Sequence, residues 1–228
     1  MAYTKTILCL AASRKHGGYC FAGKDLETDQ WIRPVSNRPD EEISDGECTG
    51  PNGTQAKLLD ILEIPLLRPT PHGYQTENHL IDPSRKWKKT GEATWQDVER
   101  ALDDHDGPLW LNRDSSWGFS NNRVKEPALD GLDNSLVLIR PKVLRIGIGQ
   151  KGGLYADAMK RLVKAYFSHV GVDYTLAVTD PIIEDRFRAG LDRTEDMTGA
   201  VACVSLGEIY RGHAYKLVAA IMAPRREV

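Results

Sequence analysis

Short apolar runs of strand length, separated by turn residues, organise the first part of the chain. Four such runs are found at residues 5–12, 19–23, 31–35 and 58–67. Gly17 and Gly18 separate the first two runs, and the polar segment 37–55 contains three glycines and two prolines. Short strands with glycine and proline between them are typical of a small β-barrel. We therefore predict such a barrel here, followed by an irregular segment over residues 70–93.

Two segments carry the start signals of short helices. Thr94 is placed as an N-cap with Asp97 three residues later, and apolar residues at helical spacing follow over residues 94–103. Asp180 precedes Pro181, a pair that is typical of an N-cap and the first helical position. The helices are too short to change the fold class, which is predicted to be all-β.

A second series of strand-like runs begins at Ser135. Its runs cover residues 135–140, 142–148, 162–170, 174–179, 200–206 and 214–223. Residues 112–134 show little apolar patterning and are rich in Asn, Asp and Gly, so the domain boundary is predicted within them. The expected architecture is two small barrels in tandem, packed together. The first takes residues 1–125, with a helix and loop insertion, and the second takes residues 126–228.

A faint internal duplication supports two comparable barrels. Trp31-Ile32-Arg33-Pro34 in the first part resembles Leu138-Ile139-Arg140-Pro141 near the start of the second strand series. Two barrels of about five strands each also account for the length of 228 residues.

Composition and charge narrow the class of protein. No apolar run approaches the ~18 residues of a membrane span, so we expect a soluble, cytoplasmic protein without membrane association. The four cysteines lack the close spacing of a zinc or redox site, and no metal or cofactor is expected. Residues 1–120 hold 14 Lys and Arg against 19 Asp and Glu, whereas residues 121–228 hold 16 against 13. The net charge of −2 argues against tight, sequence-blind binding of nucleic acid, but leaves room for a local basic face.

The turn after the first strand is the first candidate site. Ser13, Arg14 and Lys15 precede His16 and the two glycines. Glycine lets the backbone approach a ligand closely, and the two cations are suited to pairing with phosphates. A solvated basic hairpin without a ligand is the alternative interpretation.

Trp31 and Arg33 form a second candidate. They alternate with Ile32, so they face outward if Ile32 faces the core, and an aromatic ring beside a guanidinium is a platform for a nucleic-acid base. In the alternative interpretation Trp31 packs between the two barrels and Arg33 pairs with an acid such as Glu77.

Two further groups complete the candidate set. Asn78 has an amide suited to reading base edges, or else belongs to a hydrogen-bonded loop. Trp87 and Lys88 lie in the densest basic run of the chain, Arg85 to Lys89, which is suited to tracking phosphates. A surface loop whose Trp87 docks on the barrel is the alternative. Basic residues also surround the glycines near Lys151, without the order of a phosphate-binding loop.

Several blocks of the sequence, in this order, resemble the bacterial dual OB-containing domain family. They are ILCLAASRKHGGYCFAGK, WIRPVS, LLDILEIPL, QTENHLI, VTDP and VSLGEIYRGHAYKLVAAI, and they extend from about Ile7 to about Ile221. The resemblance implies two OB-fold barrels in tandem. It also implies a role related to nucleic acid, in bacterial conflict systems or mobile elements, and it implies no particular catalytic activity.

The function predicted from the sequence is therefore a non-enzymatic module that binds nucleic acid, with single-stranded DNA or RNA favoured. No GxSxG or HExxH motif supports an enzyme. Two alternatives stay open: a sensor that binds a nucleotide or modified base between the barrels, near Trp31, Asn78 and Asp180, and a scaffold for a protein partner from the same genomic system.

Overall fold

The computed structural model of the chain describes residues 2–15, 17–116, 118–150, 161–188 and 194–224. Its contacts divide the chain into two compact units. Unit 1 holds Met1–Leu102 and Gly131–Leu136, and unit 2 holds Asp103–Asp130 and Val137–Val228. The boundary predicted after residue 125 differs from this division. Residues 103–125 contact unit 2, and the short segment 131–136 returns to unit 1.

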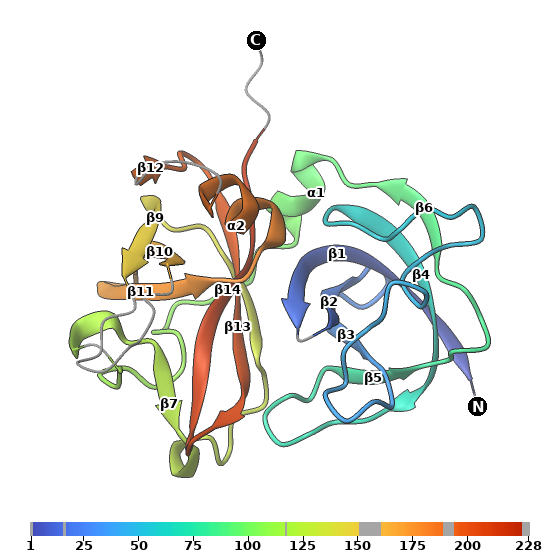
Figure 1. Cartoon of the computed structure of the whole chain (residues 1–228), viewed down its shortest axis with the longest axis horizontal. Coiled ribbons are helices and arrows are strands. Elements are labelled where there is room, and N and C mark those ends of the chain that lie inside the picture. The colour runs from blue at the N-terminus through green and yellow to red at the C-terminus, as the bar shows by residue number, and fades with distance from the viewer. Residues whose placement is uncertain (1, 16, 117, 151–160, 189–193, 225–228) are drawn as a thin grey trace. The chain divides into compact units, whose positions relative to one another are not determined.

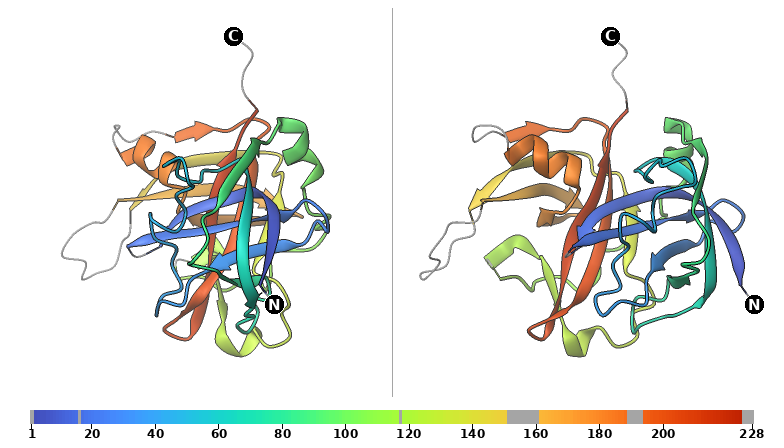
Figure 2. Two further views of the ribbon diagram at one scale, coloured as in Figure 1. Left: turned by 90° about the vertical axis from the view of Figure 1, so that its right-hand side faces the viewer. Right: turned by 45° about the vertical axis from the view of Figure 1, so that its right-hand side comes forward.

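Unit 1 is a closed five-stranded barrel with one added strand (Figure 1). Its elements are β1 (Tyr3–Lys15), β2 (Gly18–Asp25), β3 (Trp31–Val35), β4 (Asp60–Pro69), β5 (Asn78–Ile81), β6 (Lys88–Glu92) and α1 (Trp95–Arg100). The strand order is β1-β2-β3-β5-β4-β6, and β1 also pairs with β4. The β3–β5 pair is parallel and the other pairs are antiparallel. Figure 2 shows β1 as a long, curved strand, and this curvature lets its first half pair with β4 and its second half with β2.

Unit 2 repeats this arrangement with more elements. They are η1 (Gly118–Ser120), β7 (Arg123–Lys125), η2 (Glu126–Ala128), β8 (Leu136–Ile139), β9 (Leu144–Gln150), β10 (Arg161–His169), β11 (Val172–Val178), α2 (Pro181–Arg188), β12 (Thr194–Asp196), β13 (Val201–Tyr210) and β14 (His213–Met222). The sheet order is β12-β9-β10-β11-β14-β13-β8, with β7 paired to β14. β13 and β14 form a long hairpin (Figure 1). β8 lies at one end of this sheet and β9 lies next to the other end. Because β9 follows β8 directly in the chain, the segment between them connects the two sides of the sheet.

The strands that form the two barrels correspond to one another. The parallel β11–β14 pair corresponds to the parallel β3–β5 pair. β8 and β9 together correspond to β1, because β8 lies beside β13 and β9 pairs with β10. Pro141 lies between β8 and β9, where its missing N–H interrupts the ladder.

The letters that suggested a duplication do not mark equivalent positions. Arg33-Pro34 lies in β3, the third strand of its barrel, whereas Arg140-Pro141 lies in the bend of the first strand of the other. The expectation of two comparable barrels is nevertheless confirmed, and the fold is all-β.

Most expected elements are present. α1 has the predicted capping box, in which Thr94 accepts from the Asp97 backbone and Asp97 accepts from the Thr94 backbone. Asp180 caps α2 by accepting from the Ile182 and Ile183 amides at 2.9 and 3.2 Å. The prediction of an irregular segment over residues 70–93 is wrong, because this segment contains the strands β5 and β6. β6 (KKTGE) is polar throughout, and the four residues of β5 (NHLI) are too few to show an alternating apolar pattern.

Candidate nucleic-acid interface

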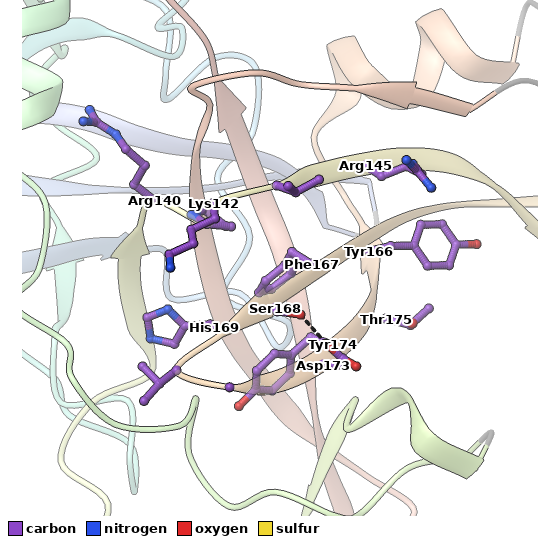
Figure 3. Close-up of a pocket in the computed structure, with 14 residues that line it drawn as sticks. Arg140, Lys142, Arg145, Tyr166, Phe167, Ser168, His169, Asp173, Tyr174 and Thr175 are labelled. Atoms are coloured by element: carbon purple, nitrogen blue, oxygen red, sulfur yellow. Dashed lines mark hydrogen bonds between the residues drawn. The ribbon is translucent and has the colours of Figure 1, made fainter.

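A groove in unit 2 combines cations, a half-buried aromatic ring and a sheet face. Its volume is about 810 Å³, and the β10–β11 hairpin and the bend between β8 and β9 line it (Figure 3). All of its lining residues lie between Arg140 and Arg145 or between Tyr166 and Thr175. The groove therefore belongs to one unit and is built by the first three strands of that barrel.

Strand register places Tyr166 at one end of the groove, between β9 and β11. It lies opposite Arg145 on β9 and opposite Thr175 on β11. Its neighbours in the strand, Ala165 and Phe167, are buried, so alternation directs Tyr166 outward. Figure 3 shows Arg145, Tyr166 and Thr175 together at this end. Partial burial raises the pKa of Tyr166, so the ring is a neutral phenol at pH 7.

Cations outnumber acids along the groove. Arg140 and Lys142 are exposed in the bend between β8 and β9. Arg145 also lines the groove, and its guanidinium forms two hydrogen bonds with Asp196, at 2.6 and 3.1 Å. The acid in the lining is Asp173, which accepts a hydrogen bond from Ser168. The groove is therefore locally positive beside an aromatic ring, in a chain whose net charge is −2.

The hairpin end of the groove is formed by His169 and exposed valines. The His169 ring stacks on His105, with centroids 5.5 Å apart and an interplanar angle of 16°. Burial and the neighbouring His105 lower the pKa of His169, so its imidazole is neutral at pH 7. Its Nε2 is buried and has no hydrogen-bond partner among the described residues. Val143 and Val170 add apolar surface beside it. This end is suited to the face of a base rather than to a phosphate.

The corresponding face of unit 1 is largely occupied. On β2 and β3 the side chains of Lys24 and Arg33 are buried on this face, and Trp31 beside them is half-buried. Segment 131–136 contributes Ser135, whose hydroxyl accepts from Arg33 Nη2 at 2.8 Å and donates to Glu77. The same face is thus largely covered in one barrel and open in the other.

The residues proposed from the sequence are spread over unit 1. Arg14 is exposed and Lys15 half-buried at the end of β1, beside a buried Ser13. Arg33 and Asn78 are brought together, with Nη1 3.3 Å from Oδ1, but both are buried. Trp31 is half-buried at the edge of a separate cavity.

Trp87 and Lys88 are neighbours with different environments. Trp87 is 2% exposed and packs edge-on against Phe21, with ring centroids 5.3 Å apart. Lys88 is 63% exposed and pairs with Glu63 at 3.3 Å. Burial makes a structural role the better interpretation of Arg33, Asn78 and Trp87. His16 and the glycines near Lys151 lie outside the described residues.

The sequence did not point to the groove. Arg140 and Lys142 flank Pro141 and are close in the chain, but Tyr166 is far from them, and nothing in the sequence sets the register that joins them. The alternation of apolar residues around Tyr166 is the signal that marks it as outward-facing.

A family model describes nearly the whole of this architecture. The model of the dual OB-containing domain matches residues 5–221. The chain belongs to the dual OB-containing domain family. No curated protein and no solved structure matches it.

The family supplies a reference for where a ligand is expected. OB barrels bind oligonucleotides on the face of their second and third strands, together with adjoining loops. In unit 2 of this dual OB-containing domain those strands are β10 and β11, which line the groove. In the described part of the chain, no helix is long and apolar enough to cross a membrane.

Proposed function

We propose that this dual OB-containing domain is a nucleic-acid-binding module that holds a single strand along the β10–β11 face of unit 2. The observation that carries the proposal is a groove that Arg140 and Lys142 line at one end and Arg145 and Tyr166 at the other, with Asp173 as the acid in the lining (Figure 3). Cations neutralise phosphates, and an outward aromatic ring stacks on an unpaired base.

Single strands fit this surface better than a duplex. Stacking on Tyr166 requires a base whose face is accessible, and bases in a duplex are covered by their neighbours. Lys164 extends the same face, opposite Gly147 on β9 and Ala177 on β11. Because these two neighbours have little or no side chain, the sheet surface beside Lys164 has room for a nucleic-acid backbone or base.

The test is fluorescence anisotropy with labelled single-stranded DNA, single-stranded RNA and duplex DNA of one length, at two salt concentrations. We expect salt-sensitive binding to a single strand, and a large loss in Lys142→Glu because it reverses a charge in the groove. Lys125→Glu is the matched control, since Lys125 is exposed on β7 and does not line the groove. Binding that is equal in both variants, or no binding at low salt, would overturn the proposal.

Arg14 and Lys15 remain a second, separate proposal for phosphate contact, in unit 1. Arg14→Glu in the same titration tests it, and an unchanged affinity would remove the hairpin from consideration. A setting in bacterial conflict systems or mobile elements, and a ligand between the barrels, stay predictions from the sequence.

A further inference from the structure

A second cavity lies in unit 1, and its chemistry differs from that of the groove. It has a volume of about 380 Å³, within the usual size range of small-molecule sites. Trp31 at the start of β3 forms one wall, and Asp29 and Gln30 come from the turn before it. Asp133 and Asn134 belong to the segment that returns to unit 1, so every lining residue lies in that unit.

The walls are held in place by hydrogen bonds. Thr76 Oγ1 donates to the Asp133 carbonyl at 2.5 Å, which fixes the returning segment beside β5. The Tyr3 hydroxyl and His79 Nδ1 are 2.5 Å apart, so the imidazole ring is oriented on the cavity side of β5. The cavity is therefore preformed, and a ligand need not order it on binding.

The charges of the cavity disfavour a phosphate group. Lys5 is the basic residue of the lining, and its ammonium is already 2.7 Å from Asp25. Three acidic residues also line the cavity, namely Asp29, Glu77 and Asp133. Glu77 is paired with Arg33 at 2.9 Å and Asp29 with Lys24 at 3.3 Å, so with Asp25 the acids exceed these cations by one. An anion placed here would meet more negative than positive charge, so a ligand rich in hydrogen-bond donors is favoured.

Trp31 favours a flat ligand, and its surroundings disfavour a cationic one. The Lys24 ammonium lies 6.0 Å from the centroid of the Trp31 ring, so a second cation at the indole would be repelled. A neutral aromatic ring stacked on the indole meets no such repulsion. The amides of Gln30 and Asn134 add donors and acceptors of the kind that read the edge of a base.

From this combination we propose that the cavity binds a guanine base, presented by a nucleoside, stacked on Trp31 with its Watson–Crick edge on Asp29. Guanine offers two adjacent N–H donors, N1 and N2, which match the two oxygens of one carboxylate. The Asp29 side chain is 69% exposed, so a ligand can reach it, and its Oδ2 also accepts a hydrogen bond from Lys24 Nζ at 3.3 Å. Adenine and cytosine present a single exocyclic amine at that edge and make a poorer match.

Isothermal titration calorimetry on the full chain tests the proposal with guanosine, adenosine, cytidine and guanosine monophosphate. We expect guanosine to bind most tightly, with no gain from the phosphate. Equal affinity for all three nucleosides, tighter binding of the monophosphate, or no binding of guanosine would each overturn it.

Asp29→Asn is the informative variant, and it preserves the turn. Asp29 has a φ of 59°, and asparagine tolerates this left-handed conformation well. The variant should weaken guanosine binding about 5- to 150-fold, because the carboxylate pair is lost. Glu27→Gln makes the same charge change in the same turn, outside the cavity lining, and should leave affinity unchanged.

Trp31→Ala gives a second readout if Asp29→Asn weakens guanosine binding less than expected, and it should also lose guanosine binding. Retained affinity in both variants would overturn the proposal. Lys142→Glu alters the groove of unit 2 and should leave guanosine binding intact, so the two proposals fail or succeed separately.

Discussion

Arg33 and Glu77 form a buried ion pair in unit 1, with Nη2 2.9 Å from Oε1 and side chains only 6% and 5% exposed. The pair joins the parallel strand β3 to the residue before β5, and the Arg33 amide also donates to the Glu77 carbonyl at 2.8 Å. Ser135 and Asn78 accept further hydrogen bonds from the guanidinium. This network occupies the face on which an OB barrel binds a strand, which favours a structural role for unit 1 there.

Arg33→Met should destabilise the protein strongly. It removes the cation and leaves the Glu77 carboxylate buried without its partner, a change that costs about 3–5 kcal/mol. Chemical denaturation measures the loss in the free energy of unfolding. Arg33→Met with Glu77→Leu should recover much of it, because neither charge of the pair is then left buried without its partner. Lys88→Met breaks the exposed pair with Glu63 and should cost less than about 1 kcal/mol. Equal costs for the two single variants would contradict this account.

Gly23→Ala should also destabilise unit 1, for a steric reason. A Cβ at this position would overlap the carbonyl oxygen of Leu8 and lie 2.8 Å from its carbonyl carbon. The clash is with the backbone of β1, beside the irregularity between Cys9 and Ala11. It therefore cannot be relieved by the rotation of a side chain. We expect a loss of about 1–3 kcal/mol in the free energy of unfolding. Gly46→Ala is the control, since a Cβ there meets nothing within 4 Å. A stable Gly23→Ala protein would show that β1 and β2 adapt more easily than expected.

Local patterns in the sequence were enough for most of the fold. Thr94 and Asp97 predict the capping box of α1, and Asp180 with Pro181 predicts the start of α2, because each signal depends on residues a few positions apart. Apolar runs likewise located most strands. The sequence does not predict β6, because its residues, KKTGE, are polar throughout and only its pairing with β4 makes it a strand.

The candidate sites depend on long-range register, which the sequence does not contain. Trp87 is flanked by four cations in the chain, a pattern that predicts a surface platform for stacking, but the structure contains the alternative, with Trp87 packed against Phe21. The alternative pairing of Arg33 with Glu77 is the one that the structure contains. Tyr166 and Arg145 are neighbours only through the β9–β10 pairing.

Lys216 should make the stability of unit 2 depend on pH. It is 1% exposed, donates to the Leu111 carbonyl at 2.8 Å and lies 5.3 Å from the Tyr174 ring centroid. Burial lowers the pKa of Lys216 to about 7, although the charge of Asp114 acts in the opposite direction. Between pH 7 and the ordinary lysine pKa, the unfolded chain holds a proton that the folded chain has released. The free energy of unfolding therefore rises with pH across this window. It falls again as pH falls toward 7, because the unfolded chain, which keeps the proton, is then favoured.

Lys216→Met isolates this contribution. The stability of the wild-type protein relative to the variant should increase by up to about 1.4 kcal/mol per pH unit between pH 7 and 10. Denaturation curves at several pH values measure it. Lys125→Met, which removes an exposed lysine of the same unit, is the matched control for the substitution itself. A flat difference for Lys216→Met would mean that the amine reaches water in the folded protein.

Tyr166→Ala should weaken the binding of single-stranded nucleic acid without unfolding the protein. The ring projects from β10 between Arg145 and Thr175, and stacking on one aromatic ring is worth about 1–3 kcal/mol per base. This range corresponds to a loss of about 5- to 150-fold in affinity, measured by anisotropy. Tyr166→Phe keeps the ring and should bind within about twofold of the wild-type protein, since stacking requires no hydroxyl group.

Tyr210→Ala is the matched control for Tyr166→Ala. Tyr210 is a tyrosine of the same unit, exposed at the tip of the β13–β14 hairpin and outside the groove lining. Its removal should leave affinity unchanged if the strand follows the β10–β11 face. A loss in Tyr210→Ala with none in Tyr166→Ala would move the interface from the groove to the hairpin tip, where Arg211 lies 5.1 Å from the Tyr210 ring centroid.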